Sequence, residues 1–71
     1  MDPEKFETLL VENGEMPPQF FYDLLAKALN PEISVAEPVL DVIKISNIPP
    51  EDLERIIKIV RDSGGRIIED K

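Results

Sequence analysis

The sequence predicts a small, mainly α-helical domain of helix-turn-helix or winged-helix type, with a short β element at the C-terminus. Two observations lead to this fold class. Apolar residues recur at helical spacing after each of two proline pairs, Pro17-Pro18 and Pro49-Pro50. A double glycine near the end of the chain is followed by the β-like run of residues 66–69. A chain of 71 residues has the length of one small domain, so we expect residues 1–71 to fold as a single acidic domain.

The first expected helix covers residues 2–13. Asp2-Pro3 suits a helix start, because aspartate can cap free backbone N–H groups and proline fits the first turn. Apolar residues between Phe6 and Leu10 recur at the spacing of one helical face. Asn13-Gly14 ends the helix, because glycine readily adopts the left-handed conformation of a helix cap.

The second expected helix covers residues 17–29 and has the clearest amphipathic pattern in the chain. It begins at Pro17-Pro18, and Asn30-Pro31 ends it because proline cannot continue a helix. Its inward face consists of five apolar residues at helical spacing: Phe21, Leu24, Leu25, Ala28 and Leu29.

Residues 30–47 fit two interpretations. Ser34 and Glu37 have the spacing of a capping box, which favours a helix that continues to a turn at Ser46-Asn47. The β-branched residues of the run 39–45 favour a strand instead. We expect the helix, and the strand stays open as the alternative.

The last expected helix begins at Pro50, and residues 63–65 (Ser-Gly-Gly) end it before the short strand. With the expected helix before it, it would form a helix-turn-helix between Glu37 and Ser63. The apolar faces of all these elements give one predicted core: Phe6, Leu9, Leu10, Phe21, Leu24, Leu25, Leu29, Leu53, Ile56, Ile57 and Val60.

The composition excludes several classes of function. The chain has no cysteine and no histidine, which removes disulfides, zinc sites of the Cys/His type, cysteine nucleophiles and histidine acid-base catalysis. No nucleotide-binding or metalloprotease motif occurs, so we expect no enzyme, no cofactor and no bound metal. No apolar run approaches the length of a membrane span and no signal peptide begins the chain, so we expect a cytoplasmic protein.

The charge of the chain opposes nucleic-acid binding. The 15 acidic residues outnumber the 8 basic ones, which gives a formal net charge of -7, and most of the excess lies before Ile48. DNA-binding proteins usually neutralise phosphates with Lys and Arg, so this excess favours a basic partner or a well-solvated surface. The acidic residues expected to form an interaction surface are Glu7, Glu12, Glu15, Asp23, Glu32, Glu37, Asp41, Glu51, Asp52, Glu54, Glu69 and Asp70.

The last third of the chain resembles a known family. Pro50-Glu51-Asp52, the pair Ile56-Ile57, the helix end Asp62-Ser63-Gly64 and the run from Arg66 to Asp70 are similar to the end of the N-terminal autoinhibitory region, region 1.1, of bacterial housekeeping sigma factors. The family's usual Gly-hydrophobic-Thr-aromatic turn is absent from residues 14–20. The resemblance implies a helical domain at the N-terminus of a longer sigma factor.

The resemblance also implies a mechanism. Such a domain is an acidic stand-in for nucleic acid, which occupies the DNA channel of RNA polymerase until promoter opening and keeps free sigma factor from binding promoter DNA. Its partners would be the RNA polymerase core and the DNA-binding regions of the same sigma factor, and it would be a monomer that does not bind nucleic acid directly. The Ile-, Glu-, Lys- and Arg-rich composition is in addition typical of a heat-tolerant source.

Two alternatives stay open. The chain could be a small protein-protein interaction module that uses an apolar groove beside Phe20 and Tyr22, with one or two apolar residues dominating the binding energy. It could instead be a winged-helix DNA-binding domain, whose contacts to phosphates and bases would come from Arg55, Lys58, Arg61 and Arg66.

Overall fold

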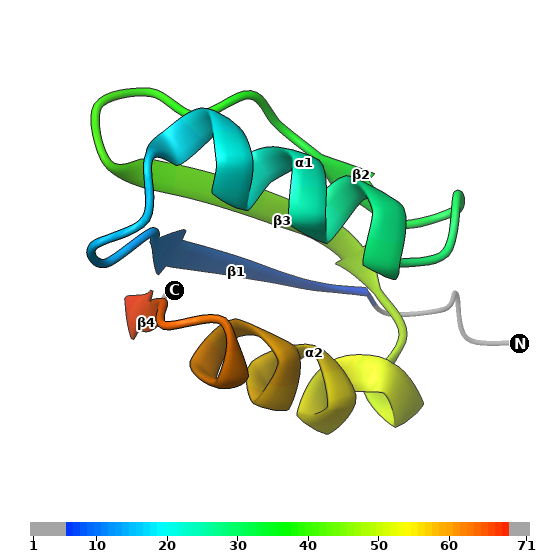
Figure 1. The fold of residues 1–71 in the computed structure, drawn as a ribbon. Coiled ribbons are helices and arrows are strands. Elements are labelled where there is room, and N and C mark those ends of the chain that lie inside the picture. The colour runs from blue at the N-terminus through cyan, green and yellow to red at the C-terminus, as the bar shows by residue number, and fades with distance from the viewer. Residues whose placement is uncertain (1–5, 69–71) are drawn as a thin grey trace, which may run out of the picture.

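The protein is a two-layer α/β domain. In the computed structural model, which describes residues 6–68, four strands and two helices follow one another as β1, α1, β2, β3, α2 and β4 (Figure 1). Their bounds are Glu7–Glu12 for β1, Pro18–Ala28 for α1, Ser34–Val35 for β2, Val42–Ile48 for β3, Pro50–Asp62 for α2 and Arg66–Ile68 for β4.

The strands form one antiparallel sheet in the order β2-β3-β1-β4. Since β1 and β2 each pair antiparallel with β3, the helix α1 connects two parallel strands that are separated by a third. The helix α2 connects β3 to β4 in the same way across β1. This is the split β-α-β, or ferredoxin-like, arrangement. The prediction of a mainly α-helical fold is therefore wrong. Proteins with many unrelated functions share this architecture, so the fold alone does not assign a function.

The first predicted helix is wrong, because residues 7–12 form the strand β1. A short apolar run such as Leu9 to Val11 fits a helix and a strand equally well in sequence. In the fold, β1 has a neighbour on both edges, and Val11 faces Ile43 on β3 and Ile67 on β4. Backbone pairing with segments distant in sequence therefore decides its conformation.

The predicted helix within residues 30–47 is also wrong, and the strand alternative holds for its second half. Along β3, Ile43 and Ile45 are buried whereas Lys44 between them is exposed, the two-residue period of a sheet with one covered face. The expected turn at Ser46-Asn47 is a β-bulge inside β3, where Asn47 has φ of 63°. Because a strand precedes α2, the helix-turn-helix and winged-helix predictions are wrong for the described residues.

The other two helices and the last strand follow the sequence prediction. Pro18 and Pro50 lie in the first turns of α1 and α2. The helix α2 ends in a Schellman motif: the Gly65 N–H donates to the Val60 carbonyl (2.9 Å) and the Gly64 N–H donates to the Arg61 carbonyl (3.1 Å). Gly64 has φ of 90°, the left-handed conformation that this motif needs. No helix within residues 6–68 is long and apolar enough to cross a membrane.

Both helices cover the same face of the sheet, where their apolar sides form one core with alternate residues of the strands (Figure 1). The buried residues are Val11, Phe21, Leu25, Leu29, Ile33, Ile43, Ile45, Ile48, Ile56 and Val60. Five predicted core residues are among them, and Leu9, Leu10, Leu53 and Ile57 are half-buried. Phe6 and Leu24 are exposed, which corrects their predicted place in the core. The assignment of Phe6 rested on a helix that does not form. The inward face predicted for the second helix was too wide, because both Leu24 and Ala28 are exposed.

Candidate functional site

Three connections meet at one end of the sheet. Glu12, the last residue of β1, pairs with Val42 at the start of β3 and with Arg66 at the start of β4. The connections that lead into or out of these positions are residues 13–17, 36–41 and 63–65. Together they are called the loop end below.

Two of these connections are in direct contact through glycines. A Cβ on Gly14 would lie 2.1 Å from the Gly64 carbonyl oxygen, and Gly14 also has φ of 67°. A Cβ on Gly65 would lie 2.6 Å from the Phe21 ring and 2.7 Å from the Glu12 carbonyl oxygen. Since real Cβ atoms do not approach other atoms so closely, only glycine fits at these two positions without displacement of the backbone or of the core.

Asn13 ties the first connection to the second. Its side chain is buried, its Nδ2 donates to the Met16 carbonyl oxygen, and its backbone N–H donates to the Asp41 carbonyl oxygen (3.4 Å). The Met16 N–H donates back to the Asn13 carbonyl oxygen (3.2 Å). The Asn13 Oδ1 atom is buried without a hydrogen-bond partner. All three connections of the loop end are therefore held to one another by packing or by backbone hydrogen bonds.

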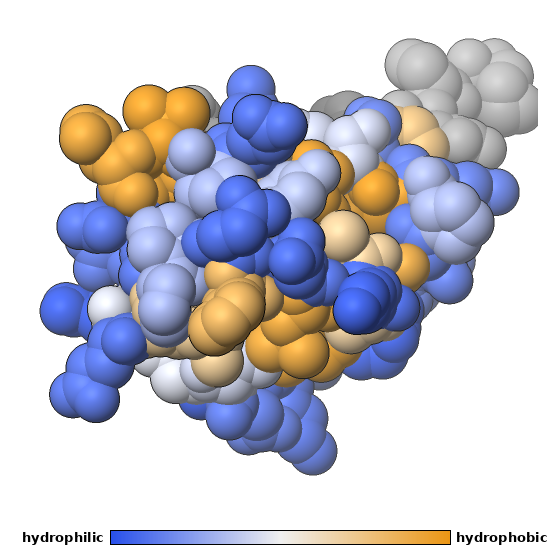
Figure 2. All heavy atoms as spheres, turned by 45° about the horizontal axis from the view of Figure 1, so that its top comes forward, coloured by the Kyte–Doolittle hydropathy of each residue, from blue (hydrophilic) through white to orange (hydrophobic). Residues whose placement is uncertain are grey.

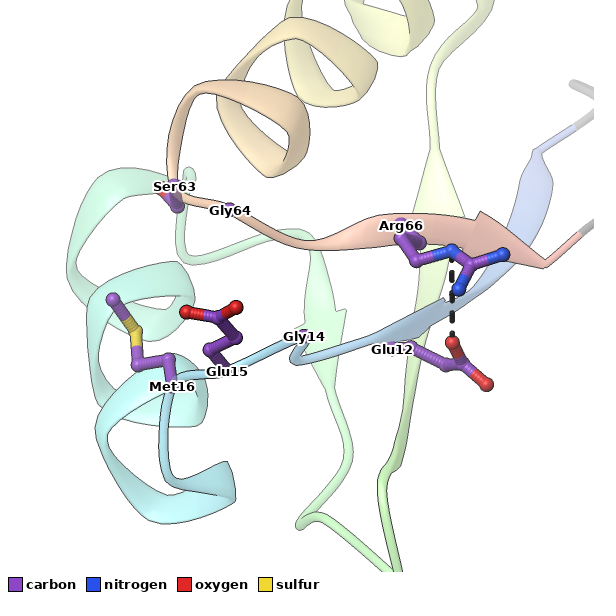
Figure 3. Close-up of a pocket in the computed structure, with 7 residues that line it drawn as sticks. All are labelled: Glu12, Gly14, Glu15, Met16, Ser63, Gly64 and Arg66. Atoms are coloured by element: carbon purple, nitrogen blue, oxygen red, sulfur yellow. Dashed lines mark ion pairs between the residues drawn. The ribbon is translucent and has the colours of Figure 1, made fainter.

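A hollow of about 770 Å³ lies between the first and third connections. Figure 3 shows Glu15 and Met16 on one side of it, Ser63 and Gly64 on the other, and an ion pair on the adjoining strands. The residues that line it are Glu12, Gly14, Glu15, Met16, Ser63, Gly64 and Arg66. In the ion pair, Arg66 Nε lies 3.9 Å from Glu12 Oε1, and the exposure of both side chains makes this a weak surface interaction.

The polar side chains that line the hollow are one hydroxyl, two carboxylates and one guanidinium. Ser63 supplies the hydroxyl, and the chain contains no histidine to act as its base. Within residues 6–68, no three carboxylates gather as metal ligands. Two carboxylates face one guanidinium here, so the charge of the hollow favours cationic groups.

The second connection ends in an exposed apolar turn. Val39 and Val42 exchange two backbone hydrogen bonds, both 3.0 Å, and thereby close a two-residue hairpin over Leu40 and Asp41. Val39 is 68% exposed and Leu40 is 88% exposed. Figure 2 shows apolar side chains projecting at the end of the molecule that carries the β2–β3 connection in Figure 1. These two residues are called the hairpin tip below.

The backbone of the hairpin tip is unusual. Leu40 has φ of 59°. Two-residue hairpins place glycine, asparagine or aspartate at such positions, because other side chains collide with the backbone when φ is positive. The sequence analysis missed this turn, because the run Val39-Leu40 contains no glycine, asparagine or aspartate to signal it.

The predicted acidic surface is divided between several parts of the fold. Glu15, Glu37 and Asp41 belong to the loop end, and Glu12 ends the adjoining strand β1. Glu51, Asp52 and Glu54 lie in the first turns of α2, where Asp52 Oδ1 is 3.9 Å from Arg55 Nε. Glu7, Asp23 and Glu32 are exposed elsewhere, and Glu69 and Asp70 lie outside the described residues. Three of the predicted site residues thus lie on connections at the same end of the sheet, which sequence spacing could not reveal.

The residues of the two alternative sites are distributed differently. Three of the basic residues, Arg55, Lys58 and Arg61, are exposed along α2. The fourth, Arg66, is exposed on β4, an edge strand of the sheet. Phe20 is 66% exposed on α1, whereas Tyr22 is half-buried against the core. Neither aromatic residue lines the hollow.

Comparison with known protein families, with curated proteins and with solved structures finds no match to this chain.

Proposed function

We propose that the chain is a small acidic protein-interaction module that binds partner proteins through the loop end. One observation carries the proposal: the three connections of the loop end contain Glu15, Glu37 and Asp41 but no lysine or arginine, and they are held together by the contact between Gly14 and Gly64 and by hydrogen bonds of Asn13. A surface that carries carboxylates and no basic residue attracts lysine and arginine side chains over a distance that depends on salt, and connections already tied to one another need little ordering when they bind.

The resemblance to region 1.1 implies the DNA channel of RNA polymerase as a partner, and such a channel would offer a basic surface of this kind. Binding of this chain to RNA polymerase remains a prediction. The helical arrangement implied by the same resemblance is not the fold of residues 6–68. The proposal therefore rests on the charge and rigidity of the loop end.

Selection from a random displayed peptide library on the immobilised whole chain, at about 0.15 M NaCl, tests the proposal. Enriched peptides are expected to be rich in lysine and arginine, and to bind more weakly at about 1 M NaCl, where charges are screened over about 3 Å. Enrichment of neutral or acidic peptides, or binding that salt does not change, would contradict the proposal. Binding of a DNA duplex under the same conditions would replace it with a nucleic-acid function.

Two charge-neutralised variants locate the surface. The first replaces three loop-end acids (Glu15→Gln, Glu37→Gln and Asp41→Asn), and the matched control replaces three exposed acids elsewhere (Glu7→Gln, Asp23→Asn and Glu32→Gln). Each variant removes the same charge, so general attraction to a polyanion changes equally in both. The loop-end variant is expected to lose most of the affinity for the selected peptides, and the control is expected to keep most of it. An equal loss in both would remove the loop end from the proposal.

A further inference from the structure

We infer that the hairpin tip, Val39-Leu40, is the apolar anchor of this interaction, and that it docks on a basic amphipathic segment of a partner protein, where apolar side chains are bordered by lysine or arginine. The inference rests on the proposed function, and it adds the residue that makes the central contact and the chemistry of the surface that receives it. Leu40 is the most exposed large apolar residue in the described part of the chain.

Exposure alone would not support this role, because single apolar side chains are common on protein surfaces. The backbone of Leu40 distinguishes it, since φ of 59° brings the Cβ atom close to the backbone and is readily adopted only by glycine, asparagine and aspartate. Glycine at this position would give a more relaxed turn. Residues in such unfavourable conformations are concentrated at binding and catalytic sites, where the side chain has a role that offsets the strain.

The tip is also held ready to bind. The hairpin is paired below it through Val35 and Ile45 and through the hydrogen bond from the Ala36 N–H to the Lys44 carbonyl oxygen (2.9 Å). The two hydrogen bonds between Val39 and Val42 close it directly beneath Leu40. An anchor that is already fixed in its bound shape loses little conformational entropy on association.

The charges around the tip indicate the kind of partner. Glu37 and Asp41 flank it and are exposed, and the connection that carries it contains no basic residue. An apolar anchor between carboxylates complements an apolar surface bordered by lysine or arginine. A second copy of this chain fits poorly at its own loop end, because Glu15, Glu37 and Asp41 of one copy would repel the same carboxylates of the other.

The other exposed apolar residues lack this combination. Phe20 and Leu24 lie one helical turn apart on the outer side of α1, in ordinary helical conformation. Asp23 and Lys27 flank them with opposite charges, and the Asp23 carboxylate accepts a hydrogen bond from Gln19 Nε2 (3.3 Å). Charge complementarity therefore selects no partner for this stripe, and it serves as a control surface.

The test is a titration of the whole ¹⁵N-labelled chain with a synthetic amphipathic helical peptide made of leucine and lysine, followed by amide chemical shifts. The same titration is made with Leu40→Gly and with Phe20→Ser, which removes an apolar side chain of comparable exposure from α1. We expect the largest shift changes in residues 36–42. The dissociation constant is expected to rise about tenfold or more in Leu40→Gly and to stay within about twofold in Phe20→Ser.

Three different failures are distinguishable. If the peptide binds with unchanged affinity to Leu40→Gly, and binding still weakens with salt, the anchor is overturned while the acidic module remains. If the peptide binds no form of the chain, or binds without dependence on salt, the anchor and the proposed function both fail. Shift changes centred on α1 with a loss of affinity in Phe20→Ser would assign the anchor to the helix and overturn the inference.

Discussion

The glycine contact and the hairpin tip lie at the same end of the molecule, yet they meet their backbone requirements in opposite ways. Gly14 and Gly64 have positive φ and are the residue type that this conformation favours. Leu40 also has positive φ, but it carries a large apolar side chain into solvent. At Gly14 and Gly64, the residue type therefore suits the backbone conformation. At Leu40 it does not, and the proposed function explains this mismatch by a contact of the Leu40 side chain with a partner protein.

Gly14→Ala tests the first half of this comparison and is expected to have the largest effect. The new Cβ would lie 2.1 Å from the Gly64 carbonyl oxygen, so the two connections must separate. We expect a loss of about 3 kcal/mol or more in the free energy of unfolding, from the collision together with the positive φ. Urea denaturation measures it.

Gly64→Ala is the matched control for Gly14→Ala. Gly64 also has a positive φ, but a Cβ there would have no atom within 4 Å. Only backbone strain is added, so a loss of about 1–2 kcal/mol is expected. Equal losses in the two variants would show that the glycine contact is not tight.

Gly65→Ala is expected to have the next largest effect. Its Cβ would meet the Phe21 ring at 2.6 Å and the Glu12 carbonyl oxygen at 2.7 Å, so both the core and β1 must move. Such overpacking is expected to lower the stability by about 1–3 kcal/mol. Each kcal/mol corresponds to a fall of about 4–8 °C in the melting temperature of a domain of this size. An unchanged melting temperature would contradict the packing described for this turn.

Asn47→Ala sharpens the comparison at a position where positive φ is already tolerated. Asn47 has φ of 63°, close to that of Leu40, but asparagine adopts this conformation readily, and its Nδ2 donates to Ser34 Oγ (3.2 Å). Alanine is expected to lower the stability by about 1 kcal/mol, and Asn47→Gly to be close to neutral. Ser34→Ala removes the exposed hydrogen bond alone. If it destabilises as much as Asn47→Ala, the backbone explanation is wrong.

Leu40→Gly is expected to have the smallest effect on stability, and of the opposite sign. Relief of the positive φ gains about 1–2 kcal/mol, and the greater freedom of glycine in the unfolded chain offsets about 0.5–1 kcal/mol of this gain. The melting temperature is therefore expected to stay the same or to rise by a few degrees. A fall of several degrees would show that Leu40 stabilises the fold through contacts of its side chain.

The sequence predicts the parts of the fold that local chemistry decides. Both helices that begin with proline pairs are present, because apolar spacing and terminal residues act within one segment. The strand β4 is also present where the double glycine marks the end of α2, although it pairs with β1, which is distant in sequence. The strand β1 could not be predicted in this way, because its conformation depends on pairing with β3 and β4, which are far away in sequence.

The candidate site was predictable in charge but not in position. The acidic excess was plain from composition, whereas the convergence of Glu15, Glu37 and Asp41 depends on the sheet order β2-β3-β1-β4. The predicted core also lacks Ile43 and Ile45. A helix was expected at these residues, so the two-residue burial period of β3 was not recognised. The hairpin tip was hidden most completely, because Leu40 belongs to the residue types that do not mark turns.

The most direct test of the central claim is the melting temperature of the chain and of Leu40→Gly, each with and without a saturating amount of the leucine-lysine peptide. A ligand raises stability in proportion to the logarithm of its concentration over its dissociation constant. Without peptide, Leu40→Gly is expected to melt at the same temperature as the unaltered chain or higher. With peptide, the order is expected to reverse. A variant that melts lower than the unaltered chain under both conditions, by the same difference, would contradict the claim that Leu40 is kept for binding rather than for the fold.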